Sequence, residues 1–133
     1  MPALGEMVSA AKGFGCFLNG EPARVSNTAE LKDALLLSTS FDRRTESLRT
    51  KATVSRTWGD CYGYVLVATG RADVMLDPVM NPWDCAALVP ILQESGGRFT
   101  DWRGRSRIDG GDAVSTNGHL HDDVLGALAG AVT

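Results

Sequence analysis

The chain has 133 residues, a formal net charge of −3 at pH 7, 44% hydrophobic residues and 22% charged residues. This length suits one domain with one hydrophobic core, and the composition is that of an ordinary soluble globular protein. The weak negative charge argues against a nucleic-acid partner, and no apolar run approaches the roughly 20 residues that cross a membrane.

The start of the chain has no basic stretch followed by an apolar one, so we expect no secretory signal. Three widely spaced cysteines, an odd number, favour reduced thiols and therefore a cytoplasmic protein. We expect all three to be small, buried, apolar side chains: Cys16, Cys61 and Cys85.

The first 26 residues predict a β-hairpin region. Residues 6–11 and 16–18 form its strands, and Asn19-Gly20 predicts a tight turn because both residues tolerate positive φ. We then expect, in chain order, a short helix, a buried strand and an exposed helix, over residues 27–34, 35–39 and 45–52.

Residues 60–69 are apolar on every face, which predicts a buried helix. Gly63 lies inside this segment and costs a helix roughly 1 kcal/mol against alanine, so it indicates close packing against a sheet. Asp60 stands at the start of the segment. It either caps the helix or faces a substrate pocket.

Two further charged residues flank this helix in the sequence. Arg56 is either a surface charge or a contact to phosphate or to a partner subunit. Residues 70–77 predict a turn and then a strand that ends at Asp77, and Asp77 is either a turn acid before Pro78 or a side chain directed into a site.

The next helix begins with a clear start signal. Asn81 is a good N-cap, since its side-chain oxygen can accept a free backbone N–H, and Pro82 suits the first helical position. Asp84 falls in the first turn, where the helix dipole favours an acid that can also reach back to the cap N–H. Spacing alone is compatible with two roles for Asp84: this capping role, or a catalytic or metal-binding role.

The remaining elements are a helix over residues 82–94, kinked or shortened by Pro90, and two strands and a final helix, over residues 98–102, 113–116 and 119–132. His119 and His121 at first suggest a metal cluster. On a helix, however, residues two apart point about 200° apart and cannot share an ion, so we expect no metal site there.

Trp83-Asp84-Cys85-Ala86-Ala87 resembles the second signature of the inositol monophosphatase family, Trp-Asp-x-Ala-Ala/Gly. The runs 56–64 and 94–97, with Asp77-Pro78, resemble the histidinol-phosphate phosphatase branch of that family. The resemblance spans nearly the whole chain. It implies an α/β fold, with a layered mixed sheet flanked by helices, and a Mg²⁺-dependent phosphomonoesterase that converts histidinol phosphate to histidinol in histidine biosynthesis.

The resemblance also implies roles for single residues. In the family, the acid of the second signature binds a catalytic Mg²⁺ and touches the substrate hydroxyl, which assigns both roles to Asp84, held by a buried Trp83. An acid six positions before the Trp hydrogen-bonds the substrate, and Asp77 has this spacing. A cationic amino-alcohol substrate favours Asp60 or Asp77 near its ammonium group, and Arg56 is the fourth substrate-binding candidate.

The family's first signature, a Glu followed by an Asp-Pro-x-Asp-Gly-Thr run, is missing from this sequence. That signature supplies most of the metal ligands. Residues 1–133 therefore resemble the C-terminal, substrate-side half of the phosphatase domain without its N-terminal metal-binding half, and we expect negligible activity from this chain alone.

Two alternatives stay open. The first keeps the enzyme class and changes the phosphate monoester to inositol 1-phosphate or a nucleotide. The second is a non-catalytic folded remnant that acts as an interaction or dimerisation module. The expected partners are a small-molecule phosphate monoester and either a second copy of the chain or the missing N-terminal half.

Overall fold

A five-stranded mixed sheet forms the centre of the protein, with the strand order β5-β4-β6-β8-β7. β4 (Leu35–Ser38) lies between β5 (Val54–Thr57) and β6 (Val74–Met80) and is parallel to both. β8 (Gly111–Thr116) pairs antiparallel with β6 on one side and with β7 (Arg98–Thr100) on the other.

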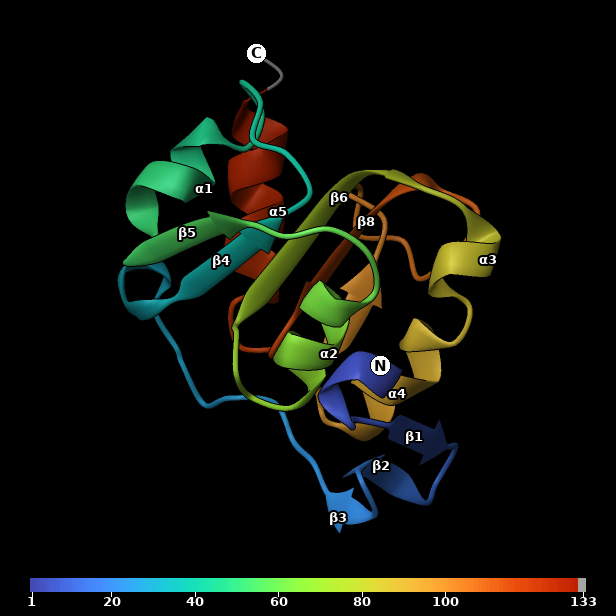
Figure 1. Cartoon of the computed structure of the whole chain (residues 1–133). Helices are drawn as coiled ribbons and strands as arrows, with labels where there is room; N and C mark the ends of the chain where they lie inside the picture. Colours follow the sequence, from blue (N-terminus) through green and yellow to red (C-terminus); the bar gives the residue numbers. More distant parts are fainter. Residues whose placement is uncertain (132–133) are drawn as a thin grey trace.

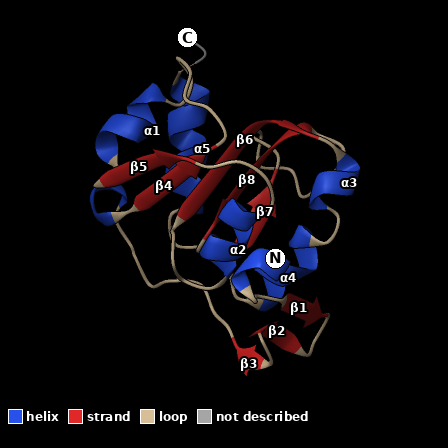
Figure 2. Cartoon of the chain, in the orientation of Figure 1, coloured by secondary structure: helices blue, strands red, loops and turns tan. Residues whose placement is uncertain are grey.

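Helices cover both faces of this sheet in the computed structural model, which describes residues 1–131 (Figure 1). One face carries α1 (Glu46–Lys51) and α5 (His121–Gly130), and the other carries α2 (Tyr62–Ala68) and α4 (Leu88–Glu94). Figure 2 shows the resulting layers of helix, sheet and helix. The predicted fold class, a layered mixed sheet flanked by helices, is therefore confirmed.

Strand β6 supplies side chains to two separate cores, because alternate residues of a strand point to opposite faces. Val74 and Leu76 join the core under α1 and α5, whereas Met75 joins the core under α2 and α4. All three side chains are fully buried. The prediction that this strand ends at Asp77 is wrong, because β6 continues to Met80. A strand buried on both faces is held by packing on each side, so Asp77, the next residue along β6, is held firmly in place.

The first residues form a separate antiparallel sheet of three strands: β1 (Val8–Ala11), β2 (Gly15–Leu18) and β3 (Glu21–Pro22). The predicted hairpin is thus confirmed. Asn19 and Gly20 both have positive φ, at 52° and 86°, as the turn required.

This small sheet is attached to α4 by a carboxylate. The two side-chain oxygens of Glu94 accept hydrogen bonds from the backbone N–H groups of Gly13 and Gly15, at 2.8 and 2.9 Å. The pKa of Glu94 is lowered, first by these two hydrogen bonds. One side chain therefore links the β1–β2 turn to a helix of the main sheet.

The predicted helix over residues 82–94 is two helices, α3 (Pro82–Cys85) and α4. The break falls at Ala86 and Ala87, before Pro90. A proline ring clashes with the carbonyl four residues earlier, and for Pro90 that is the carbonyl of Ala86. The proline thus acts one turn upstream of its own position.

Other segments differ from expectation more locally. The helix expected over residues 27–34 is only a 3-10 turn at Leu31–Asp33, since Asn117 Nδ2 holds the carbonyl of Thr28 at 2.7 Å in a non-helical segment. β5 has an exposed polar pattern typical of an edge strand, and the sequence did not reveal it. The last helix begins at His121, and residue 132 of its predicted span lies outside the described residues.

Within residues 1–131, no helix combines the length and apolar character needed to span a bilayer.

The packing of Gly63 generates the first prediction. A Cβ at Gly63 would lie 2.5 Å from Sδ of Met75, so Gly63→Ala should lower the free energy of unfolding by roughly 1–2 kcal/mol in a urea titration. Gly126 in α5 has open space at the same position, and Gly126→Ala should instead raise it by about 0.5–1 kcal/mol. Equal effects of the two substitutions would contradict the close approach of α2 to the sheet.

Candidate functional site

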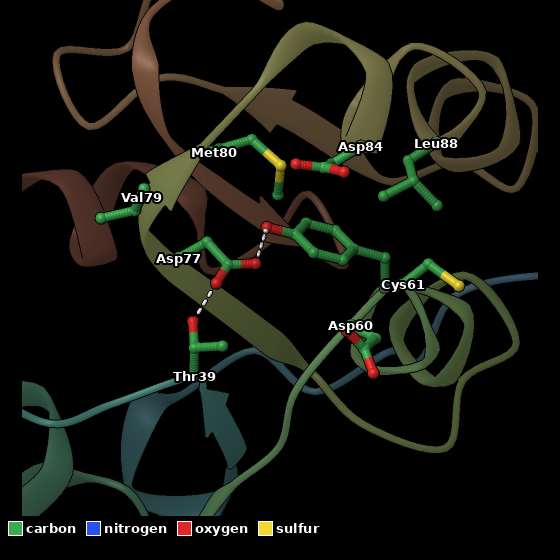
Figure 3. Close-up of a pocket in the computed structure, with 9 residues that line it drawn as sticks. Thr39, Asp60, Cys61, Asp77, Val79, Met80, Asp84 and Leu88 are labelled. Carbon is green, nitrogen blue, oxygen red and sulfur yellow. Dashed lines mark hydrogen bonds between the residues drawn. The ribbon is translucent and has the colours of Figure 1, made fainter.

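A cavity of about 380 Å³ opens beside the end of β6 (Figure 3). It lies where the parallel strands β4 and β6 end, which is where α/β sheets commonly bind ligands, and its volume suits a small molecule. Nine residues line it: Thr39, Asp60, Cys61, Tyr64, Asp77, Val79, Met80, Asp84 and Leu88. The structure thus brings together three of the four predicted site residues, and Arg56 is not among them.

Asp77 is the most buried of the three acids, with 6% of its surface exposed. One carboxylate oxygen accepts a hydrogen bond from the Tyr64 hydroxyl at 2.7 Å, and the other accepts one from the Thr39 hydroxyl. Burial, reinforced by the negative charges of Asp84 and Asp60, raises the pKa of Asp77 to about 6, although the Tyr64 hydrogen bond lowers it. A cation in the cavity would offset the repulsion among these three carboxylates.

Asp84 stands in the first turn of α3, and its carboxylate does not cap that helix. Its backbone N–H donates to the carbonyl of Asn81 at 3.0 Å, and Asn81 Nδ2 donates to Asp84 Oδ2 at 3.1 Å. The expected cap, in which the Asn81 oxygen accepts a helix N–H, is therefore wrong, because this amide points its N–H₂ group at the acid. Oδ1 of Asp84 accepts no hydrogen bond from residues 1–131.

The prediction of a buried Trp83 is also wrong, since 79% of this side chain is exposed. α3 has only four residues and is anchored through Cys85, which is fully buried and whose Sγ lies 3.5 Å from the carbonyl oxygen of Ile108. Trp83 lies on the outer side of this short helix. It therefore cannot hold Asp84 in place within this chain.

Asp60 precedes α2 in a left-handed conformation, with φ of 61°. It does not cap the helix, because Cys61 occupies the cap position and makes no side-chain cap bond. A non-glycine residue with positive φ is uncommon, and such residues cluster at functional sites. Here the conformation accompanies an exposed carboxylate at the cavity.

Cys61 is exposed at the edge of the cavity, so its predicted burial is wrong, whereas Cys16 and Cys85 are buried as expected. Because α2 starts only at Tyr62, the segment before it lies at the surface.

Arg56 lies on the edge strand β5, exposed to solvent, and its guanidinium donates to the carbonyl of Ser55 at 2.8 Å. The structure does not bring it to the cavity.

Sequence reasoning missed the two hydroxyl groups that hold Asp77. Tyr64 follows Asp60 by four residues, so the helical spacing could have placed it on the same side of α2. Thr39 directly follows β4, and a polar residue at the end of a parallel strand is a recognisable signal.

Carboxylate oxygens are the ligands that Mg²⁺ prefers, which suits Asp84 and its neighbours. Within residues 1–131, however, no three acid, histidine or cysteine side chains lie close enough to hold a metal ion. The residues present therefore supply suitable donors but do not complete a metal site.

His121 has a structural role in the core. It is fully buried, and its two ring nitrogens lie 3.0 Å from the hydroxyls of Thr100 and Thr116. Burial lowers its pKa to about 4, so the ring is neutral at physiological pH.

Comparison with known proteins gives a consistent match. The profile described as the inositol monophosphatase family matches residues 1–131. A histidinol-phosphatase of Chlorobaculum parvum is 44% identical, over 96% of this chain and 52% of that protein. A histidinol-phosphatase of Mycobacterium tuberculosis is 39% identical, over 96% of this chain and 54% of that protein.

Solved structures agree with this match. An inositol monophosphatase from Anabaena superimposes with a TM-score of 0.89 at 31% identity, over 97% of this chain and 56% of that one. The IMPase of Thermotoga maritima gives the same TM-score and identity, over 98% of this chain and 54% of that one. The chain thus spans about half the length of the relatives it matches.

The raised pKa of Asp77 predicts a pH-dependent stability. Because this pKa lies at about 6 in the folded protein and at the ordinary value of 3.8 in the unfolded chain, the folded state favours the protonated acid, and stability is lost as pH rises from 4 through 6. Asp77→Asn removes this loss. From pH 4 to pH 7 the variant should gain on the order of 3 kcal/mol relative to wild type in urea titrations.

Asp123→Asn, at an exposed position in the first turn of α5, is the matched control for the loss of one carboxylate outside the cavity. If the two variants have the same pH profile, the Asp77 carboxylate is not buried as described.

Proposed function

The chain belongs to the inositol monophosphatase family, as its motifs predicted, and we propose that it forms the substrate-binding half of a Mg²⁺-dependent phosphatase acting on histidinol phosphate. The relatives named histidinol-phosphatase support this substrate. This phosphatase would act in histidine biosynthesis, in the cytoplasm.

The negative charge of the cavity lining is the observation that supports this substrate. Three carboxylates line it, and no Arg, Lys or His from residues 1–131 does so. Such a wall repels a phosphate group that lacks a counterion, and it attracts a cationic group. A phosphate monoester with an ammonium group at its other end matches this wall better than neutral inositol.

The three acids have different parts in this proposal. Asp77, buried and oriented by Tyr64 and Thr39, accepts hydrogen bonds from the substrate's ammonium group. Asp60, in the segment that precedes α2, accepts a second hydrogen bond from the same ammonium group. Asp84, with an oxygen that accepts no hydrogen bond from the described part of the chain, contributes one metal ligand and orients the ester oxygen.

Bound Mg²⁺ would neutralise the phosphate oxygens and lower the pKa of an attacking water. Residues 1–131 offer too few donors for that ion. We therefore place the remaining ligands in the half of the enzyme that this chain does not cover, and a second copy of the chain is the less favoured source.

Activity is predicted to require both halves. The 133-residue chain with Mg²⁺ should release no phosphate from histidinol phosphate above background. A chimera that carries the preceding half of the Chlorobaculum parvum enzyme ahead of residue 1 should release it. Phosphate release by the isolated chain would refute the division of the site, and a chimera that favours inositol 1-phosphate or a nucleotide would refute the substrate.

Asp77 should discriminate between cationic and neutral substrates. In the chimera, Asp77→Asn should raise KM for histidinol phosphate about 10- to 100-fold, because a charge-assisted hydrogen bond is lost, and should change KM for inositol 1-phosphate far less. Arg56→Gln, outside the cavity, is the control and should change neither. Equal effects of Asp77→Asn on both substrates would contradict the ammonium contact.

A further inference from the structure

A second cavity, of about 230 Å³, lies along β7, at the edge of the main sheet opposite to β5. It is lined by residues 97–100, by Gln93 in the last turn of α4, and by Gly104 and Ser106 in the loop that follows β7. Its volume suits a molecule of few atoms, smaller than a drug-sized ligand. No residue lines both this second cavity and the first cavity, at Asp77, so the two are separate sites.

The lining of the second cavity has the opposite charge to that of the first. Within residues 1–131, Arg98 is the only charged residue that lines it. The surrounding stretch, residues 97–107, contains four arginines and one acid, Asp101. That acid is buried and paired with Arg105 at 2.7 Å. A small anion is therefore attracted to β7, whereas the three acids of the first cavity repel it.

Arg98 keeps hydrogen-bond donors available for a ligand. A guanidinium carries several N–H groups, and within residues 1–131 Arg98 makes a side-chain hydrogen bond only through Nη1, to Asp122 Oδ1 at 2.9 Å. The Asp122 side chain is 85% exposed, and exposed ion pairs are weak, so Asp122 orients the guanidinium and neutralises it little. The remaining donors can bind both oxygens of a carboxylate.

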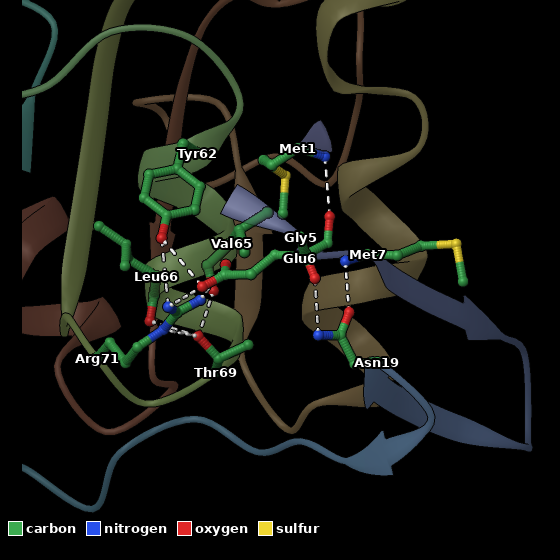
Figure 4. A network of polar contacts seen from close by, with 10 residues as sticks. All are labelled: Met1, Gly5, Glu6, Met7, Asn19, Tyr62, Val65, Leu66, Thr69 and Arg71. Atoms are coloured by element: carbon green, nitrogen blue, oxygen red, sulfur yellow. Dashed lines mark hydrogen bonds and ion pairs between the residues drawn. The ribbon is translucent and has the colours of Figure 1, made fainter. Parts of the chain in front are cut away.

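Arg71 shows how an arginine with a structural role differs. Its Nη1 and Nη2 groups donate to the two carboxylate oxygens of Glu6 at 2.8 and 3.0 Å, and its Nε donates to Thr69 Oγ1 at 2.9 Å (Figure 4). The guanidinium also lies over the Tyr62 ring, 5.6 Å from its centre. All three nitrogens of Arg71 thus hold the fold together, in contrast to those of Arg98.

Two neutral polar side chains complete the lining. Within residues 1–131, the Gln93 amide and the Ser106 hydroxyl make no hydrogen bond to the protein, so both are available to a ligand. The Thr100 hydroxyl, by contrast, donates to the carbonyl of Asp101 at 2.8 Å and lies 3.0 Å from His121 Nε2. One cation with two neutral polar groups suits a ligand with one negative charge and a further polar group, since a second charge would lack a partner.

A pair of packed aromatic rings connects the second cavity with the first. Phe99 lines the second cavity and is buried, and its ring centre lies 6.0 Å from that of Tyr64. Tyr64 lines the first cavity and donates to Asp77 at 2.7 Å. Because close-packed interiors transmit small displacements, a ligand that moves Phe99 also moves the side chain that orients Asp77.

We propose that the second cavity binds a small organic acid with a single carboxylate, anchored by Arg98 and hydrogen-bonded by Gln93 and Ser106, and that this binding alters the orientation of Asp77 through Phe99 and Tyr64. The binding site is a property of this chain and does not depend on the proposed substrate. Its effect on catalysis rests on the proposed function.

Lactate and lactamide test the site as a matched pair, because they have nearly the same shape and differ in charge. In an NMR titration of the isotope-labelled 133-residue chain at constant ionic strength, lactate should give saturable shifts of the amides of Gly97, Phe99, Gly104 and Ser106. Lactamide should bind about 10-fold more weakly, since it cannot form charge-assisted hydrogen bonds. No saturable shift with lactate, or equal binding of the two molecules, would overturn the proposal.

Substitutions identify the anchor. Arg98→Gln should weaken lactate binding about 10-fold, and Arg98→Lys, which keeps the charge and loses the planar fork, should restore part of the affinity. Arg103→Gln is the matched control, because it removes an equal charge from the same stretch at a residue outside the lining. It should leave the affinity nearly unchanged at about 0.15 M ionic strength, where exposed charges are screened. Equal losses in Arg98→Gln and Arg103→Gln would show that lactate follows net charge, and would overturn the site.

The link to the first cavity has its own readout. In the isolated chain, the amides of Tyr64 and Asp77 should shift along the same saturation curve as those at β7, and both sets of shifts should weaken together in Arg98→Gln. Binding at β7 with no change at Tyr64 or Asp77 would overturn the link.

The chimera with the preceding half of the Chlorobaculum parvum enzyme tests the effect on catalysis. Lactate should change its KM for histidinol phosphate, and Arg98→Gln should abolish that change. Lactate that binds an active chimera without changing KM would refute the link. A chimera that binds lactate and does not hydrolyse histidinol phosphate would support the second site and refute the proposed substrate.

Discussion

The burial of a single carboxylate on β6 determines the chemistry of the cavity. β6 is buried on both faces from Val74 to Asp77, so Asp77 is held just past the pairing of β6 with β4 and cannot turn to solvent. Two hydroxyls from different segments fix its oxygens, and two further acids stand nearby. Negative charge concentrated in this way is unfavourable without a cation. The cores on both faces of the sheet supply the stability that keeps these acids together.

A second buried ionisable group, His121 at the start of α5, changes the stability with pH in the opposite sense to Asp77. His121 is held neutral between two threonines, and burial lowers its pKa to about 4. Since its folded pKa lies below the unfolded value, its contribution to stability is present above pH 6.5 and is lost as pH falls through 4. Asp77 acts in the opposite sense over nearly the same interval, so the two groups partly cancel in the wild-type protein.

The sequence predicted the layers of the fold and the acids that line the cavity, because both depend on patterns within short stretches of the chain. Apolar runs revealed the buried strands and α2, and the resemblance to family motifs indicated Asp77 and Asp84. The sequence did not reveal features that depend on contacts between residues far apart in the chain. Trp83 is exposed because a four-residue helix has only one side to bury, and β5 is polar because it is an edge. The conformation of Asp60 and the hydroxyl of Thr39 matter only once the chain is folded.

The distribution of thiols has a practical consequence. Cys16 and Cys85 are buried, and Cys61 is exposed beside Asp60 at the mouth of the cavity. A thiol-reactive fluorophore would thus attach at one place on the native protein without any engineered residue. Its emission would follow the filling of the cavity by small molecules, which turns an unremarkable side chain into a built-in reporter of occupancy.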